Sequence, residues 1–463
     1  KYNLEYYVQL AKDIENAGAH ILAIKDMAGI LKPDAAFELV SALKSRINIP
    51  LHLHTHDTSS IQAATYLKAI EAGVDVVDVA LGGLSGLTSQ PNFNSIVEML
   101  RFHDRGRSIN TDKLNEYSRY WEAVRSYYFP FESGLKAGSG EVYKHEIPGG
   151  QYSNLKPQAE SLGLADRFHE ITEMYSKVND LFGDIIKVTP SSKVVGDMAQ
   201  YLVSNNLSIE DVLEKGEDIS FPQSVKSFFR GDLGQPYGGF PEKIQKIVLK
   251  DEKPYTERPN AHLDPIDFDK EYAEFQSTFG EGMGRDLEIT DFLSYKLYPK
   301  VFTDAYNHHQ EFGSVINVPT KNFFYGMEPG EEIIVELDRG KTLLIQFLSR
   351  GETDEDGMSK IFFKVNGQTR TVEVKDKSVK VEKVVHQKVD KNDKKQIGAP
   401  LQGALSNIQV EVGQKVEKNQ PLFVIEAMKM ETTITANNSG EIDKIVLQEG
   451  EMVYADDLVI VMK

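Results

Sequence analysis

Short apolar runs and helical patterns alternate through the first part of the chain. Three of these runs, at 21–25, 51–56 and 74–81, have the length and composition of strands, and the segments between them carry apolar residues at helical spacing. Strands joined through helices pair in parallel, because each helix crosses back over one face of the sheet. Such a series fits a (β/α)8 barrel or an open doubly wound sheet. No GxGxxG phosphate loop accompanies it, so the barrel is favoured.

A complete barrel of eight strands needs about 200–250 residues. Beyond the three strands, only the run at 142–147 is a candidate for a fourth. The sequence therefore predicts the C-terminal half of a (β/α)8 TIM barrel over 1–160, without its first strands. The chain also begins at Lys1, directly before a helical pattern and without an initiator Met, and we interpret this as a truncation point.

The rest of this multidomain α/β chain changes character three times. A mainly helical pattern at 161–300 predicts an extension of the barrel, and short alternating runs with an Asn-Gly turn at 301–382 predict a small mixed β module. Residues 383–397 are rich in Lys, Asp and Gln with almost no large apolar side chains, which predicts a solvated, flexible tether. Residues 398–463 form the last predicted domain.

The last domain contains an internal repeat. Two copies of a strand-turn-strand unit predict a small β-sandwich with pseudo-twofold symmetry. Between the copies, Lys429 occupies an expected hairpin tip with a Met on each side. A lone surface Lys is usually only solvated, whereas a carrier attachment site needs such an accessible amine. The repeat matches four positions at one offset, with Gly403, Ile408, Gly413 and Val416 recurring as Gly440, Ile445, Gly450 and Val453.

Three histidines alternate along the predicted strand at 51–56. Alternate residues of a strand share a face, so His52, His54 and His56 are expected to point together into the barrel. Barrel enzymes work at the C-terminal ends of their strands, which makes His54 and His56 candidate ligands of Zn²⁺ or Mn²⁺. His52 would lie deeper, in a structural role. The plainer alternative is a row of buried imidazoles that bond to their neighbours.

Lys25 ends the preceding strand at the same side of the sheet. A free ammonium would repel a divalent cation, so an unmodified Lys25 argues against a metal site. A carbamate formed with CO₂ would reverse the charge and supply oxygen ligands. The chain has 0 Cys, so no thiolate is available as a ligand or nucleophile.

Charge and hydropathy exclude some partners. The 52 Lys and Arg against 70 Asp and Glu leave a net charge of −18, which disfavours nucleic acid and anionic membrane surfaces. No apolar stretch approaches the ~20 residues of a membrane span. We therefore expect a soluble, cytoplasmic protein.

Motifs in family order resemble the carboxyltransferase domain of the pyruvate carboxylases. The Ala-Met-Lys-Met segment at 427–430 also resembles the biotin carboxyl carrier domain, in which this Lys is biotinylated. Lipoyl carriers share that fold but typically show acidic and Ala neighbours, and they stay as a minor alternative. The carboxyltransferase motifs lie at 24–33, 51–58, 147–154 and 187–193.

The resemblance implies a reaction and its cofactors. The carboxyl group of carboxybiotin on Lys429 would pass to pyruvate and give oxaloacetate, after a step that uses ATP, Mg²⁺ and bicarbonate in a biotin carboxylase domain absent here. A divalent metal, Zn or Mn, would be held by carbamylated Lys25, His54 and His56. The metal-binding Asp and the pyruvate-binding arginines belong to the missing half. Residues 301–382 would link the domains and form a homotetramer, and biotin protein ligase would be a partner.

The resemblance also assigns Thr189. In the family this Thr shuttles a proton between pyruvate and biotin, and a hydroxyl can both donate and accept. The alternative is a hydroxyl that only caps a loop before a Pro. Gln151, Ser192 and Lys193 are weaker candidates for the biotin pocket.

Two rival hypotheses remain. The α chain of an oxaloacetate decarboxylase shares the barrel, the ligands and the carrier, runs the reverse transfer and feeds a membrane pump. Gln151-Tyr152 and the module at 301–382 favour the pyruvate carboxylases. From another class, the chain would act only as a biotin carrier and assembly scaffold. We expect the chain alone to be inactive, because half of its barrel is absent.

Overall fold

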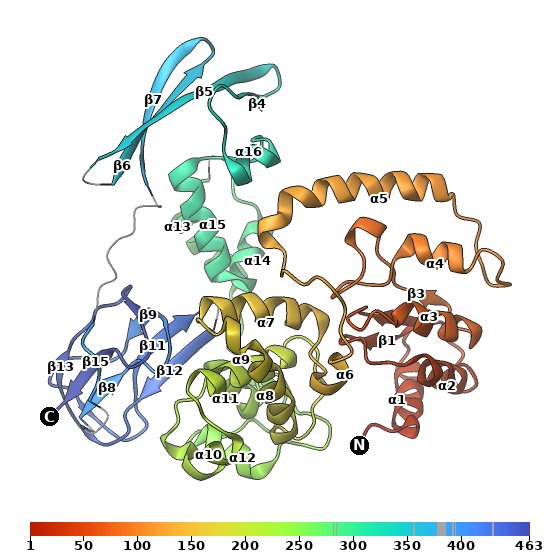
Figure 1. The fold of residues 1–463 in the computed structure, drawn as a ribbon. Coiled ribbons are helices and arrows are strands. Elements are labelled where there is room, and N and C mark those ends of the chain that lie inside the picture. The colour runs from red at the N-terminus through yellow and green to blue at the C-terminus, as the bar shows by residue number, and fades with distance from the viewer. Residues whose placement is uncertain are drawn as a thin grey trace. The chain divides into compact units, whose positions relative to one another are not determined.

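The computed structural model describes residues 1–280, 282–283, 285–354, 357–376, 386–390, 393, 395–427 and 430–463 (Figure 1). These residues divide into two compact units, Lys1–Ala261 together with Val385–Lys463, and His262–Val384. Among the described helices, none combines the length and the apolar character needed to cross a bilayer.

The first unit opens with the predicted alternation of helices and strands. The three strands pair in parallel in the order β1-β2-β3. Along β2, Leu51 and Leu53 are buried under the helices, against Val40 and Tyr66, while His52 and His54 on the opposite face stay half-buried. The elements are α1 (Leu4–Asn16), β1 (Leu22–Asp26), α2 (Pro33–Lys44), β2 (Leu51–Thr55), α3 (Gln62–Glu71) and β3 (Val76–Val77).

Two sequence-based expectations about strands fail. The run at 142–147, the candidate fourth strand, contains helix α6 (Val142–His145), and the expected strand at 74–81 is reduced to β3. Within α6, Val142 and His145 are the buried residues, three positions apart, which is the spacing of a helix and not of a strand. Glu146 then ends the helix in a left-handed conformation, φ 52°. A short apolar run does not by itself separate these two structures.

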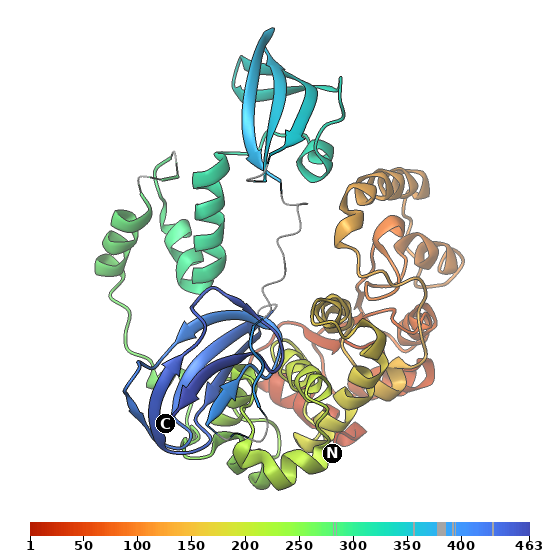
Figure 2. The same cartoon turned by 60° about the vertical axis from the view of Figure 1, so that its left-hand side comes forward.

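A helical layer follows the parallel sheet. Helix α8 buries Ile171, Tyr175 and Val178 on one face, and the rings of Phe182 and Phe229 meet edge to face at 4.9 Å in the same core. Figures 1 and 2 show α8, α9, α11 and α12 clustered together. The α-helices that follow β3 in this unit are α4 (Phe93–Met99), α5 (Thr111–Arg125), α6 (Val142–His145), α7 (Gly149–Ser161), α8 (Phe168–Leu181), α9 (Ser191–Ser204), α10 (Ile209–Lys215), α11 (Gln223–Arg230) and α12 (Glu242–Leu249).

The second unit combines helices with an antiparallel sheet of order β4-β5-β6-β7. It begins at His262, earlier than the expected boundary after residue 300, because Phe275 and Phe279 of α13 pack with Phe292 of α14 in one aromatic core. The predicted Asn366-Gly367 turn joins β6 to β7, and both residues have positive φ. Its elements are α13 (Phe268–Phe279), α14 (Ile289–Leu297), α15 (Pro299–Phe312), α16 (Thr320–Tyr325), β4 (Glu332–Asp338), β5 (Lys341–Thr353), β6 (Met358–Val365) and β7 (Gln368–Lys375).

The C-terminal domain contains two four-stranded sheets, β12-β11-β9-β14 and β10-β13-β15-β8. Strands β9 and β10 come from the first copy of the repeat, yet they pair with β14 and β13 of the second. Each sheet therefore needs strands of both copies, so neither copy can bury its apolar face alone. The strands are β8 (Gln396–Gly398), β9 (Gly403–Ile408), β10 (Lys415–Val416), β11 (Pro421–Ala427), β12 (Met430–Thr435), β13 (Gly440–Ile445), β14 (Met452–Val453) and β15 (Leu458–Met462).

The described residues of the segment 383–397 do not form the flexible tether that the sequence predicts. Lys388 forms an ion pair with buried Asp457, Nζ to Oδ1 at 2.8 Å, and Ile397 of β8 is buried. These residues therefore belong to the C-terminal domain, because backbone hydrogen bonds join this polar segment to β15 and to the residues just before it. Residues 383–385, 391, 392 and 394 lie outside the described part of the chain.

Candidate active site

Lys25 and His54 lie side by side at the C-terminal ends of two parallel strands. They are register partners of β1 and β2, on the face of the sheet that the helices do not cover. Lys25 is exposed and His54 is half-buried. Register partners in neighbouring strands point to the same face of a sheet, so both side chains lie on this face.

His54 and His56 each use one ring nitrogen to bond the protein. The Nδ1 of His54 lies 2.7 Å from Oδ2 of Asp78, and the Nδ1 of His56 lies 2.5 Å from the carbonyl oxygen of Thr88. The ring centroids are 5.1 Å apart. Burial lowers the pKa of His56, and the nearby charges of His54 and Lys25 act in the same direction. Among the described residues, the structure shows no hydrogen-bond partner for the second nitrogen, Nε2, of either ring, and a ring nitrogen of this kind can bind a metal.

Asp78 is a site residue that the sequence reasoning missed. Its two oxygens bond His52 Nε2 and His54 Nδ1, both at 2.7 Å. Burial alone would raise the pKa of Asp78, but these two hydrogen bonds hold that pKa below its usual value. The sequence carried no signal for Asp78, because the register that brings it beside His54, with His52 paired to Val76 and Leu53 to Val77, is known only from the structure. A carboxylate behind an imidazole is a common support for a metal ligand.

These residues fit a divalent metal only with Lys25 as a ligand. Within the described residues, no group of three His, Cys, Asp or Glu side chains is placed to hold a metal ion. The Nε2 atoms of His54 and His56 would supply two imidazole nitrogens, and a carbamate on Lys25 would add the oxygen that the site needs.

The loop after β1 is held tightly beside this cluster. The Asp26 carboxylate accepts hydrogen bonds from the backbone of Gly29 and Leu31 at 3.1 and 2.9 Å, and from the Thr55 hydroxyl at 2.9 Å. Gly29 has φ +74°, and a Cβ there would lie 2.0 Å from the carbonyl oxygen of His56. The loop and the histidine strand therefore fit together only with glycine at this position.

We expect Gly29→Ala to destabilise the first unit by about 3 kcal/mol, since the methyl group meets backbone and the conformation is left-handed. Gly18→Ala is the matched control: Gly18 has φ +91° with nothing within 4 Å of an added Cβ, so only the conformational cost of about 1 kcal/mol applies. Urea unfolding of both variants measures the difference. Equal losses would contradict the close packing of this loop on His56.

The motif at 147–154 packs against the same loop. Gly149 donates its N–H to the carbonyl of Met27 at 2.7 Å, and a Cβ on Gly149 would lie 2.5 Å from Nδ1 of His56. Three of the motifs found in the sequence therefore meet at His56, although about a hundred residues separate the first from the third.

The motif at 187–193 is joined to this assembly through side chains. Lys187 Nζ binds Glu146 Oε2 at 2.9 Å, and Gln151 of α7 packs on Gly196 of α9, where an added Cβ would lie 2.6 Å from its Nε2. Thr189 is exposed just before α9 begins.

At the start of α9, Ser192 is buried and Lys193 is half-buried. The amine of Lys193 binds Oδ2 of the buried Asp197 at 2.7 Å. Lys429 lies outside the described residues, between the paired ends of β11 and β12 at Ala427 and Met430. The structure therefore positions every candidate residue except Lys429.

His145 stabilises the motif at 147–154 through a hydrogen bond and a ring contact. It is 7% exposed, its Nδ1 accepts the N–H of Ile147 at 3.0 Å, and its ring stacks on Tyr152 at 5.4 Å. Burial lowers the pKa of His145 to about 4, against a raising influence of Glu146. The folded protein therefore holds this imidazole neutral.

We expect His145 to make the first unit less stable in acid. Between about pH 6.5 and 4, His145 binds a proton in the unfolded chain but not in the folded chain. The free energy of unfolding is therefore highest above pH 6.5 and falls toward pH 4, by about 3 kcal/mol in total. Urea unfolding at about pH 7.5 and about pH 4.5 measures the loss. His145→Gln keeps an acceptor for Ile147 and should flatten the profile; an unchanged profile would assign the acid sensitivity to other groups.

Three family models match successive parts of the chain. An HMGL-like model matches residues 1–120, a conserved carboxylase domain matches 142–346, and the biotin-requiring enzyme domain matches 395–462. All four motif regions of the site fall within the first two matches, and Lys429 falls within the last.

Curated relatives extend the similarity over nearly the whole chain. Pyruvate carboxylase of Bacillus subtilis is 50% identical over 99% of this chain, that of Staphylococcus aureus is 46% identical over 99%, and the mitochondrial enzyme of Mus musculus is 42% identical over 99%. The chain spans only about 40% of the length of these relatives.

Solved structures agree with these relatives. The carboxyl transferase domain of Rhizobium etli pyruvate carboxylase with pyruvate and biocytin matches with a TM-score of 0.76 and 49% identity, over 82% of this chain and 63% of that chain. The complete multifunctional enzyme of the same organism matches with a TM-score of 0.74 and 46% identity, over 100% of this chain and 42% of that chain. In sequence, domain order and fold, this chain therefore matches the C-terminal part of the pyruvate carboxylases.

Proposed function

We propose that this chain carries out the carboxyl transfer of a biotin-dependent pyruvate carboxylase, from biotin on Lys429 to pyruvate, with oxaloacetate as product. The observation that carries the proposal is the cluster at the strand ends, where His54 and His56 bond the protein through Nδ1 beside Lys25. The same chain also matches a biotin-requiring domain. The similarity to pyruvate carboxylases across 99% of the chain supports the same reaction.

The proposal also covers the barrel, the β-sandwich and the linking region. The three parallel strands would be part of a (β/α)8 barrel whose other strands lie outside this chain, which accounts for the uncovered face that carries Lys25 and His54. The paired four-stranded sheets would form the β-sandwich of the carrier. Residues 301–382 would link the domains and support a homotetramer.

Lys25 as a carbamate, His54 and His56 would hold a divalent metal, Zn or Mn. A bound cation supplies electrostatic stabilisation for the negative charge that develops on pyruvate as its methyl group loses a proton. Asp78 would orient the ring of His54 through the 2.7 Å contact, and Thr88 would do the same for His56. Both contacts would leave Nε2 of each ring to bind the metal.

Thr189 would move the proton. Thr189 is exposed just before α9, and its hydroxyl would accept the methyl proton of pyruvate and donate a proton to biotin. Gln151, Ser192 and Lys193 would line the biotin pocket, and Asp197 would hold the Lys193 amine in place. The remaining steps, which use ATP, Mg²⁺ and bicarbonate, and attachment of biotin by biotin protein ligase would depend on other polypeptide. A cytoplasmic location is part of the same proposal.

A chimeric enzyme tests the proposal. The matched region of Bacillus subtilis pyruvate carboxylase is replaced by this chain, and oxaloacetate is measured with pyruvate, bicarbonate and ATP. We expect pyruvate-dependent oxaloacetate formation that requires all three substrates. A folded, biotinylated chimera that makes no oxaloacetate would overturn the proposal, and the same chimera with His54→Ala and His56→Ala serves as the inactive reference.

A further inference from the structure

A buried carboxylate, Asp197 of α9, bonds side chains from two helices. Its Oδ2 accepts hydrogen bonds from the Lys193 amine at 2.7 Å and from the Ser224 hydroxyl of α11 at 2.6 Å. The Asp197 side chain is 2% exposed, whereas that of Lys193 is 39% exposed. The ion pair therefore extends from the interior of the helical layer to its surface.

Burial makes a charged Asp197 costly. It raises the pKa of this carboxyl group, and the charge of Lys193 together with the hydrogen bonds from Lys193 and Ser224 acts in the opposite direction. Replacing a buried ion pair with apolar side chains of similar size often leaves a protein equally stable or more stable. The stability of the helical layer therefore does not explain why Asp197 and Lys193 are paired here.

The stability of α9 does not explain the pair either. Lys193 lies in the first turn of this helix, where a cation opposes the helix dipole. A Lys four residues before an acidic residue is also the less favourable order for an ion pair on a helix. The position of the pair indicates instead that the Lys193 amine is needed where it lies, four residues after Thr189.

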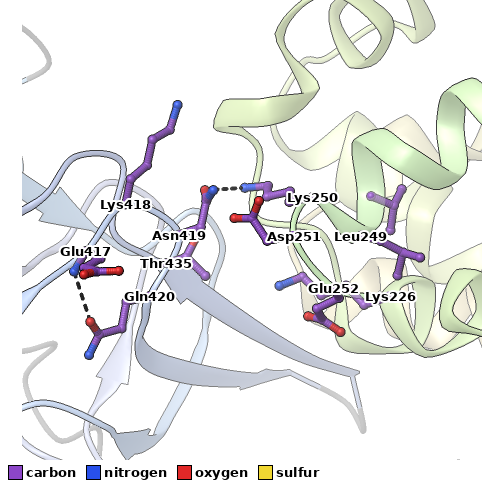
Figure 3. Close-up of a pocket in the computed structure, with 11 residues that line it drawn as sticks. Lys226, Leu249, Lys250, Asp251, Glu252, Glu417, Lys418, Asn419, Gln420 and Thr435 are labelled. Atoms are coloured by element: carbon purple, nitrogen blue, oxygen red, sulfur yellow. Dashed lines mark hydrogen bonds between the residues drawn. The ribbon is translucent and has the colours of Figure 1, made fainter. Parts of the chain in front are cut away.

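Ser224 is held in place by the packing of α11. This helix packs against α9 and buries Phe229 in the apolar core. Lys226 of the same helix lines a separate cavity of about 350 Å³, between α12 and the turn at 417–420, whose walls carry both amines and carboxylates (Figure 3). Ser224 therefore reaches Asp197 from a firmly packed helix, and it adds a hydrogen bond without adding a second charge.

We propose that Asp197 and Ser224 are positioning residues that hold the Lys193 amine at one place for carboxyl transfer. The inference rests on the proposed function, in which Lys193 lines the biotin pocket. As the carboxyl group passes from biotin to the methyl carbon of pyruvate, the electron pair of the broken carbon–nitrogen bond passes to the ureido group of biotin. The proton that Thr189 relays from pyruvate then neutralises this charge. A fixed ammonium beside the ureido group stabilises the charge, whereas a half-exposed Lys without its anchor spreads over many rotamers.

Steady-state assays on the chimeric enzyme, with pyruvate varied, test the inference. We expect Asp197→Asn to lower kcat about 10–100-fold without raising KM for pyruvate, because the displaced amine acts on biotin. Ser224→Ala should lower kcat about fivefold, since it removes one hydrogen bond to the same carboxylate. Ser227→Ala is the matched control, because Ser227 is half-buried on the same helix but bonds Gln223. It should stay within about twofold of the parent.

A double-mutant cycle separates positioning from a general effect on folding. If Asp197 acts through Lys193, then Asp197→Asn should change kcat by less than about twofold in a chain that already carries Lys193→Met. A merely structural role would lower kcat by the same factor in both backgrounds.

Urea unfolding of the whole chain examines the same pair without any need for activity. Lys193→Met should lower the urea midpoint, because it leaves a buried carboxylate without its counter-charge, and the added Asp197→Asn should raise the midpoint again.

Three kinetic results would overturn the inference. They are an unchanged kcat in Asp197→Asn, an equal loss in the Lys193→Met background, and a loss in Ser227→Ala as large as that in Ser224→Ala. An inactive parent chimera would contradict the proposed function instead. The urea midpoints would then still decide whether Asp197 holds Lys193, and a midpoint unchanged by Lys193→Met would show that it does not.

Discussion

Lys429→Arg is expected to abolish oxaloacetate formation by the chimeric enzyme, with a fall of at least about a thousandfold in the rate. The guanidinium keeps the positive charge and most of the length of the side chain, but it stays protonated and cannot form the amide that attaches biotin. Without the carrier, no carboxyl group reaches pyruvate. Streptavidin blotting of the purified protein should lose its signal together with the activity.

The matched control is Lys444→Arg, an exposed Lys on β13 of the same domain. It should keep both the streptavidin signal and the activity, because it lies outside the segment between β11 and β12. Biotin retained in Lys429→Arg would move the attachment site to another lysine. Activity retained without biotin would remove the carrier from the mechanism altogether.

Thr189→Ala should lower the rate of oxaloacetate formation by about 10²–10⁴-fold, the usual contribution of a positioned proton-transfer group. Thr189 is exposed just before α9, and its hydroxyl is the only part of the side chain that this role needs. Thr189→Ser keeps the hydroxyl and should recover most of the rate. Steady-state assays on the chimera, with pyruvate varied, measure all three proteins.

A second readout separates chemistry from folding. ATP cleavage that depends on bicarbonate and biotin takes place before carboxyl transfer, so Thr189→Ala should leave it within about twofold of the parent. Loss of both reactions would indicate damage to the structure. Wild-type oxaloacetate formation in Thr189→Ala would eliminate the proton-transfer role and leave the hydroxyl as a loop cap.

The two predictions draw on different kinds of information. Lys429 was identified from sequence alone, by the repeat around it and the two flanking Met residues, and the described structure adds only its neighbouring strands. Thr189 depends on a motif whose contacts the structure supplies, through Lys187 with Glu146 and Gln151 with Gly196. A failure of one prediction therefore leaves the other standing.

Local periodicity determined much of this protein. Short apolar runs predicted the strands of Lys25 and His54, alternation by two predicted the face that His52 and His54 share, and the repeated glycines predicted the C-terminal domain. These patterns succeed because the period of a strand is a property of the backbone itself. The run at 142–147 failed because so few apolar residues fit a helix and a strand equally well, and packing decided for the helix.

Only the tertiary structure decided which faces meet. The contact of Asp78 with His54 and the close packing of Gly149 on His56 join segments that no local pattern relates. Even the polar segment at 386–390 was drawn into the C-terminal domain by Asp457. A residue's own neighbours in the chain determine its conformation, but its partners depend on how all the buried surfaces fit together, and that is a property of the whole fold.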